Sequence, residues 1–339
     1  MMAALSWSRP KPEPRAITLL VLLSLSAVAL LWLALSLGSL SVTATDIWLA
    51  LQGRGTPMLH TVIVQWRLPR ALMALLCGLA LGISGAVFQS LLRNPMGSPD
   101  VIGFNTGAYT GALVTVILLK GSDLAMAAGS LVGGCLTALA IFALAWQQGI
   151  SRLRLIIVGI AVSAMLTALN IWLLMSSTQE SALTAALWSA GSLNGITWSK
   201  AWPVMFPCLL LAALCCSGQR PLRQLELGDD LAHASGVAVQ KTRLLLMLAG
   251  VALAAIATAM TGPIPFVALA APQIAQRLGR SPSPSLISAG LTGAVLLVSA
   301  DLVAQHALDG IQLPVGVVTT SLGGLYLLVL LLDGNRNRS

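Results

Sequence analysis

The side chains that most often do enzymatic chemistry are few and scattered in this sequence. Its three histidines, His60, His233 and His306, lie far apart, and we expect none of them to bind a metal ion. Its five cysteines stand inside apolar runs without a CxxC spacing, which favours small buried hydrophobic residues over disulfide or metal chemistry. A P-loop needs a Gly-Lys pair, and the sequence has none. The sequence therefore predicts no catalytic residue, no metal site and no ATP site in this chain.

One polar segment, Leu225 to Val237, has the residue types of a short contact helix. We expect Asp229 to be its N-cap, Asp230 to favour the positive end of the helix, and Gly236 to be its C-cap. A helix of fewer than two turns is unstable alone in water, so it must pack on another surface. That surface is most simply a partner protein, and the alternative is a plain connecting loop with incidental caps.

A second group of polar side chains lies inside apolar stretches. Gln89, Asn105 and Asn170 are candidates for a translocation path, because polar groups within membrane segments are often functional. The alternative is that they join helices to one another by hydrogen bonds. Asp301 and Gln305 share the pattern, and for Asp301 the joining role is favoured because it lies near the end of its stretch.

The elements that must position these side chains are membrane helices. The chain has 339 residues, of which 57% are hydrophobic and 9% are charged, and its mean hydropathy is +0.88. A soluble domain carries about 25% charged residues, so this chain has too few to coat a particle in water. The net charge of +8 comes from bases scattered between apolar runs, without the basic stripe of a nucleic-acid-binding protein.

Ten membrane segments can be placed by length, since a span needs about 20 mostly apolar residues. Seven of the stretches are uncharged: 17–37, 71–92, 101–119, 124–146, 155–175, 201–217 and 244–276, the last with two segments. The eighth, 285–332, has polar interruptions and splits at Asp301 to Gln312 into two segments.

The 244–276 stretch needs a break because it is too long for one span. Gly262, Pro263 and Pro265 stand in its middle, and proline ends a helix at the residue before it. We therefore expect one full span, a helix break at these three residues, and a short returning helix.

Basic residues orient the segments. With the N-terminus inside, Arg54, Arg67, Arg70, Lys120 and Lys200 lie outside and the other fourteen of the 19 basic residues lie inside, as the positive-inside rule requires. We therefore expect one transmembrane domain over 1–339, with a cytoplasmic N-terminal tail at 1–16, a cytoplasmic loop at 218–243 and a cytoplasmic C-terminal tail at 333–339. A short helix over 182–192 is expected at the outer surface.

The segment 225–237 resembles the cytoplasmic coupling helix of ABC importer permeases for iron siderophores, haem and cobalamin. The shared positions are Gly228, Asp229, Asp230, Ala232, Gly236 and Val237. Further stretches are similar to that family, and together they cover nearly all of the chain after residue 60. They are Arg67–Arg70 with 78–89, 93–100 with 103–108, 262–272, and 313–319.

The resemblance implies an all-α, polytopic membrane protein with the type II ABC importer permease fold and ten transmembrane helices. It implies a bacterial inner-membrane location, two ATPase subunits that hold ATP and Mg, a second permease subunit and a periplasmic siderophore-binding protein. This chain would bind no cofactor of its own. The coupling helix would fit a cleft on the ATPase, and Arg67 and Arg70 would pair with glutamates of the binding protein. For these arginines the alternative is anchoring at the membrane interface.

Two stretches, 96–108 and 190–195, resemble the family members that carry ferric enterobactin and pair with a paralogous permease. Another iron chelate, haem or cobalamin stays open as the substrate. The family often has histidine after Pro272, where this chain has Gln273, and we assign that residue no role. An alternative of another class is an ion-coupled secondary transporter, which the near-absence of acidic residues within the spans disfavours.

Overall fold

The computed structural model describes residues 14–38, 40, 42–146, 152–281, 283, 285–308 and 310–336. Within these ranges the chain forms helices and links, and Leu308 and Ile311 form an isolated bridge, so the predicted all-α class is confirmed. The helices are α1 (Pro14–Ser36), α2 (Ala44–Leu51), α3 (Pro57–His60), η1 (Thr61–Arg67), α4 (Leu68–Leu92), η2 (Pro99–Ile102), α5 (Phe104–Leu113), η3 (Val114–Leu118), α6 (Asp123–Ala145), α7 (Arg152–Met175), α8 (Gln179–Ser189), α9 (Trp198–Ser217), α10 (Gln219–Leu227), α11 (Asp229–Ala234), α12 (Val239–Thr261), α13 (Val267–Gly279), α14 (Leu286–His306) and α15 (Val315–Arg336).

Seven described helical stretches are long and apolar enough to cross a membrane. They are α1, the continuous stretch Pro57–Leu92 that ends with α4, α6, α7, α9, α12 and α14. Two shorter apolar helices, Phe104–Leu118 and Val315–Leu328, and the 13-residue α13 fill the other predicted positions. Each of the ten predicted segments thus coincides with a helix, while a full crossing by these last three stays a prediction.

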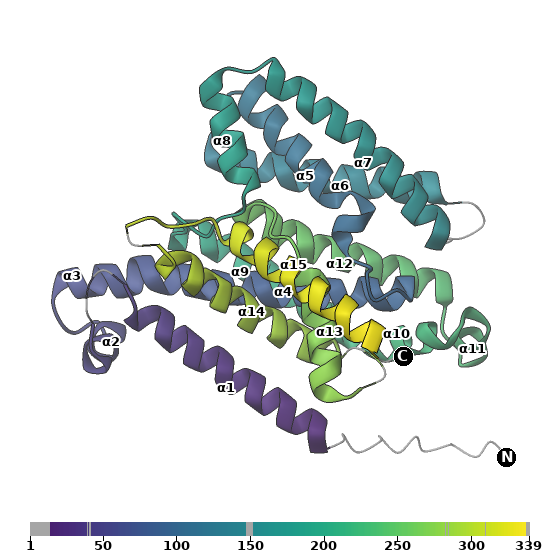
Figure 1. Ribbon diagram of the computed structural model, residues 1–339, viewed down its shortest axis with the longest axis horizontal. Coiled ribbons are helices and arrows are strands. Elements are labelled where there is room, and N and C mark those ends of the chain that lie inside the picture. The colour runs from purple at the N-terminus through teal and green to yellow at the C-terminus, as the bar shows by residue number, and fades with distance from the viewer. Residues whose placement is uncertain are drawn as a thin grey trace.

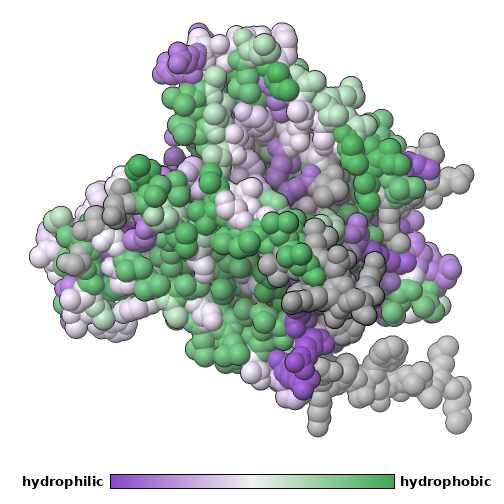
Figure 2. Space-filling model, viewed as in Figure 1, coloured by the Kyte–Doolittle hydropathy of each residue, from purple (hydrophilic) through white to green (hydrophobic). Residues whose placement is uncertain are grey.

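The surface of the molecule is apolar over much of its area, as Figure 2 shows for one face. Large hydrophobic side chains such as Leu25, Met165 and Met175 are exposed on α1 and α7. In water such a surface would be unstable, so the bilayer must cover it. This arrangement identifies the chain as a multi-pass membrane protein.

Helix α4 forms the centre of the fold and packs against α9, α12, α13 and α14. Figure 1 shows α5, α6, α7 and α8 as a group beside this centre. The tight contact between α4 and α14 depends on small residues: a Cβ atom on Gly78 would lie 2.4 Å from the carbonyl oxygen of Gly293. Close backbone approach through glycines is the usual way in which membrane helices pack.

The predicted helix break is confirmed. Helix α12 ends at Thr261, Gly262 has a φ of +70°, and α13 begins at Val267 after Pro263 and Pro265. The carbonyl oxygen of Thr261 accepts a hydrogen bond from the amide of Ser192 at 2.6 Å. The broken backbone is thus satisfied by protein, as membrane depth requires.

Four predicted boundaries differ from the structure. The predicted outer helix over 182–192 lies three residues earlier, at Gln179–Ser189, because the hydroxyl of Thr178 caps the amide of Ser181 at 3.3 Å. The 218–243 loop holds two helices, α10 and α11, and α12 begins inside it at Val239. Helix α1 starts at Pro14, inside the predicted N-terminal tail, and α15 runs to Arg336, inside the predicted C-terminal tail. Residues 1–13 and 337–339 of those tails lie outside the described residues.

Candidate functional site

The predicted contact helix is present as α11, and it follows α10 at a sharp turn. Gly228 makes this turn with a φ of +139°, a value that side chains other than hydrogen rarely allow. At the other end, Gly236 has a φ of +81° and donates its amide to His233, while Val237 donates its amide to Ala232. These two bonds form a Schellman motif in which Ser235 is the C-cap and Gly236, the predicted C-cap, is the residue directly after it.

Asp229 has a different role from the predicted one. Gly228 takes the cap position and Asp229 is the first helical residue, so its carboxylate is turned toward neighbouring helices. Arg243 of α12 donates to both carboxylate oxygens, at 2.9 and 3.0 Å, and its side chain is only 5% exposed. Arg93, directly after α4, also reaches Asp229, at 3.3 Å. The carboxylate therefore holds α11 against two long helices.

Helix α10 was not predicted from the sequence, and hydrogen bonds beside α11 hold it against the rest of the chain. Arg93 donates from Nε to the carbonyl oxygen of Leu225 at 3.0 Å, and its Nη2 contacts the same oxygen. The hydroxyl of Ser283, in the link between α13 and α14, donates to Glu226 at 2.6 Å. Helices α10 and α11 thus form one unit that is bonded to α4, α12 and the α13–α14 link.

The outward face of this unit is apolar at its centre. Leu227 and Leu231 lie on either side of the turn at Gly228, and they are 72% and 58% exposed. Asp230 and His233 are exposed beside them, whereas Ala232 is fully buried and seats α11 on the protein. We name Leu227, Asp230, Leu231 and His233 the coupling surface. Two exposed leucines beside charged groups are typical of a protein–protein contact.

The predicted binding-protein residues lie at the opposite end of α4. Arg70 and Arg93 are 23 positions apart on this helical axis, which corresponds to about 35 Å. Figure 1 likewise shows α2 and α3 at one end of the molecule and α10 and α11 at the other. The arginines and the coupling surface are therefore separated by roughly the thickness of a bilayer core, which is about 30 Å.

Both arginines are engaged within the chain. The guanidinium of Arg67 donates to the carbonyl oxygens of Leu35 at 2.7 Å, Ser36 at 3.3 Å and Leu40 at 3.1 Å, and so satisfies the C-terminal end of α1. Arg70 forms an ion pair with Asp301 of α14 at 2.8 Å.

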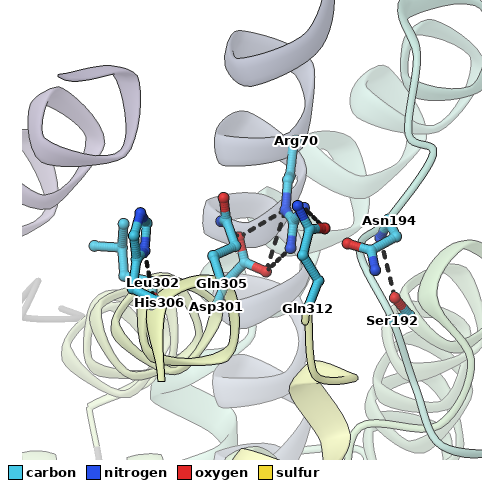
Figure 3. Close-up of polar contacts among 8 residues, drawn as sticks. All are labelled: Arg70, Ser192, Asn194, Asp301, Leu302, Gln305, His306 and Gln312. Atoms are coloured by element: carbon cyan, nitrogen blue, oxygen red, sulfur yellow. Dashed lines mark hydrogen bonds and ion pairs between the residues drawn. The ribbon is translucent and has the colours of Figure 1, made fainter. Parts of the chain in front are cut away.

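The Arg70 ion pair belongs to a larger network, which Figure 3 shows. Arg70 Nη1 also donates to Gln312 at 3.2 Å, and Gln305 donates to Asp301 at 2.7 Å. This network joins α4, α14 and the link before α15, so the expected joining role of Asp301 is what the structure shows.

Each of the three path candidates contacts a neighbouring part of the chain. Gln89 donates to the carbonyl oxygen of Leu269 at 2.9 Å, which joins α4 to α13. Asn170 of α7 donates to the carbonyl oxygen of Thr106 at 3.4 Å, and its own Oδ1 is buried without a hydrogen-bond partner.

Asn105 of α5 directly precedes Thr106, whose carbonyl oxygen accepts from Asn170. Asn105 donates to Asp100 and accepts from Thr258 at 3.5 Å. Asp100 lies in η2, where desolvation raises the pKa of its carboxyl to about 6. All three polar side chains therefore make contacts between elements in this conformation.

Comparisons with known proteins agree with this geometry. The FecCD transport family matches residues 25–333. The ferric enterobactin transport system permease protein FepG of Escherichia coli K12 is 52% identical over 305 residues, which cover 89% of this chain and 91% of that protein. The iron(3+)-hydroxamate import system permease protein FhuG of Bacillus subtilis 168 is 33% identical and covers 88% of this chain and 92% of its own length.

Other relatives extend the same picture. The vitamin B12 import system permease protein BtuC of Shigella boydii is 33% identical over 88% of this chain and 91% of its own length. Among solved structures, an inward-facing metal-chelate type ABC transporter matches with a TM-score of 0.83 and 28% identity, covering 94% of this chain and 99% of that one. The fold is thus that of ABC importer permeases.

Proposed function

This chain belongs to the FecCD transport family, and from that premise we propose that it carries ferric enterobactin across the bacterial inner membrane. It is a permease subunit of an ABC importer, and ATP hydrolysis takes place on separate subunits. The main evidence for this substrate is sequence identity: the chain is 52% identical to the ferric enterobactin permease, but only 33% identical to the hydroxamate and vitamin B12 relatives. The alternatives are another iron chelate, haem or cobalamin.

The class of importer requires an ATPase and a substrate-binding protein as partners. We further propose that two ATPase subunits and a second, paralogous permease complete the transporter, and that both termini are cytoplasmic. The orientation is supported by the excess of basic residues on the side of the coupling surface. ATP and Mg would be held by the ATPase, and this chain would hold neither.

The coupling surface is where the ATPase would dock. Leu227 and Leu231 would enter a cleft on that subunit, and Asp229 would transmit its movement through Arg243 and Arg93. Because α10 and α11 are bonded to α4 and α12, a displacement at this surface would move these helices as rigid bodies.

The binding protein would dock at the other end of the molecule, near Arg67 and Arg70. Because both arginines form hydrogen bonds within this chain, part of their role is to stabilise its fold. Docking by glutamates would then add to these contacts and set the register of the complex. Charge reversal at Arg67 should weaken docking of the loaded binding protein at low salt, whereas unchanged affinity would leave only the structural role.

Gln89, Asn105 and Asn170 stay candidates for the translocation path. The buried, unpartnered oxygen of Asn170 supports this proposal most directly, since an unsatisfied acceptor in a membrane protein is costly to keep. The contacts of all three residues with backbone or side chains of neighbouring helices support the alternative, a role in holding helices together.

Uptake by whole cells tests the substrate. Cells that lack this chain would be supplied with ferric enterobactin, a ferric hydroxamate, haem or cobalamin, each labelled with radioactive metal. We expect loss of ferric enterobactin uptake alone, and restoration of that uptake by the gene on a plasmid. If uptake of another of these compounds is lost while ferric enterobactin uptake stays intact, that compound is the substrate and the proposal is wrong.

A further inference from the structure

Gln273 is a buried glutamine whose amide contacts two other parts of the chain. It lies in α13 and is 8% exposed. Its Nε2 donates to the carbonyl oxygen of Pro95 at 2.7 Å, in the link after α4. Its Oε1 accepts from the hydroxyl of Tyr326, in α15, at 3.5 Å. One side chain therefore connects α13, α15 and the α4–α5 link, using its donor at one end and its acceptor at the other.

The α4–α5 link, which Gln273 contacts at Pro95, also contacts the helices of the coupling surface. Pro95 is two residues after Arg93, which bonds to Asp229 and to the carbonyl oxygen of Leu225. Pro95 lies in a closed turn: the carbonyl oxygen of Asn94 accepts from the amide of Gly97 at 2.9 Å, and the side chain of Asn94 accepts from the amide of Met96 at 3.0 Å. Arg93 directly precedes this turn, so a displacement of Arg93 reaches Pro95 through two peptide bonds.

Helix α15 lies beside an apolar pocket of about 210 Å³ that opens to the surface and is lined by Phe266, Ile274, Leu296, Leu322 and Tyr326. Next to this pocket, Gly323 of α15 packs closely on Phe266, because a Cβ atom on Gly323 would lie 2.2 Å from the ring. The hydrogen bond between Tyr326 and Gln273 is a polar contact that fixes α15 at the same place.

We propose that Gln273 is a positioning residue that joins the coupling surface to α15, so that a displacement of α11 reaches α15 through Arg93, Pro95 and Gln273. The inference rests on the proposed function in one respect, namely that an ATPase pushes on α11. The two hydrogen bonds of Gln273 then determine how far α15 is displaced when α11 moves. They have no part in the docking of the ATPase.

The test uses the complete transporter in proteoliposomes, with this chain, its partner permease, the ATPase, the binding protein and radiolabelled ferric enterobactin. Three variants separate the contacts. Gln273→Leu removes both hydrogen bonds and keeps the size of the side chain, and Tyr326→Phe removes one hydroxyl only. Gln273→His restores one donor and one acceptor. The measured quantities are the amount of co-purified ATPase, the rate of ATP hydrolysis and the substrate transported per ATP hydrolysed.

For Gln273→Leu we expect ATPase binding and ATP hydrolysis within about twofold of wild type, while substrate transported per ATP falls about threefold to tenfold, the usual range for residues that modulate coupling. Tyr326→Phe should shift the same ratio in the same direction by less, and Gln273→His should recover it. Because Tyr326→Phe removes a single oxygen, it keeps the test valid if Gln273→Leu does not fold.

Two results would overturn the inference. One is an unchanged ratio in both Gln273→Leu and Tyr326→Phe. The other is a parallel fall of hydrolysis and transport, which is the result expected if Gln273 only stabilises the fold. Failure of the proposed function is recognised separately, in wild-type proteoliposomes: absence of ferric enterobactin transport would overturn the proposed substrate, and transport without the ATPase would be a third result that overturns the inference.

Discussion

The guanidinium of Arg70 and the carboxylate of Asp301 form a two-point ion pair, with Nη2–Oδ1 at 2.8 Å and Nε–Oδ2 at 3.1 Å. The two residues are 231 positions apart and belong to α4 and α14. The side chains are 15% and 4% exposed, so the pair is screened from water. Figure 3 shows the pair between the helices, with Gln305 and Gln312 beside it.

Removal of one member of this pair should be more damaging than removal of both. Arg70→Ala leaves the Asp301 charge buried without its partner, which costs about 3 kcal/mol of folding free energy. The double variant Arg70→Ala with Asp301→Ala should regain part of that loss. The measurement is the melting temperature of the purified full-length protein in detergent. Additive losses in the double variant would contradict a coupled pair.

The prediction of this fold from sequence succeeded where the determinants are local. The break at Gly262, Pro263 and Pro265 depends on the backbone limits of those residues themselves. The end of α11 at Gly236 is likewise decided by one residue that tolerates a positive φ.

The long-range hydrogen bonds and ion pairs could not be predicted in this way. The contact between Arg93 and Leu225 joins residues 132 positions apart, and nothing in the local sequence of either gives the distance. Helix α10 was missed because its polar residues and Pro221 are typical of a loop, whereas Leu222 and Leu225 bury one face against the membrane helices. The contacts that hold α10 and α11 against the long helices are therefore visible only in the structure.

Asp229 and Asp230 are neighbours that should differ in effect. Asp229→Ala removes the carboxylate that Arg243 and Arg93 share, so α11 loses its bonds to α12 and α4. Asp230 is exposed on the coupling surface, and Asp230→Ala leaves those bonds in place. We expect uptake to fall about tenfold in Asp229→Ala, in line with the loss of charged hydrogen bonds, and much less in Asp230→Ala. Equal effects of the two variants on uptake, at matched protein levels, would argue against this anchoring role.

Gly236 offers a graded test of the end of α11. A Cβ atom at this position would meet nothing within 4 Å, so any cost of substitution comes from its φ of +81°. Gly236→Ala should cost about 1 kcal/mol, and Gly236→Asn less, because asparagine tolerates this conformation. Gly236→Pro should be worst, since proline requires a φ of about −65° and removes the amide that bonds to His233.

Uptake of radiolabelled ferric enterobactin, divided by the amount of membrane-inserted protein, measures this series. The expected order of uptake is wild type, Gly236→Asn, Gly236→Ala and then Gly236→Pro. Normal uptake by Gly236→Pro at wild-type protein levels would show that the end of α11 does not matter for transport.

Gly85 and Gly324 form a matched pair for the packing of the core. A Cβ atom on Gly85 of α4 would lie 1.7 Å from the carbonyl oxygen of Ala268, whereas one on Gly324 of α15 would meet nothing within 4 Å. Gly85→Ala must therefore separate α4 from α13, at a cost of about 3 kcal/mol or more. Gly324→Ala should be neutral or slightly stabilising, because alanine is the better helix former. Melting of both variants in detergent measures the difference, and similar melting temperatures would contradict the close approach of α4 and α13.

The most direct test of the central claim is ATP-dependent accumulation in proteoliposomes. The vesicles would contain this chain with its partner permease and ATPase, and they would be supplied with loaded binding protein and radioactive ferric enterobactin. The account predicts accumulation that requires hydrolysable ATP and that falls about tenfold when Asp229→Ala weakens the anchoring of α11. Accumulation without ATP, driven by an imposed proton or sodium gradient, would contradict it and identify a secondary transporter instead.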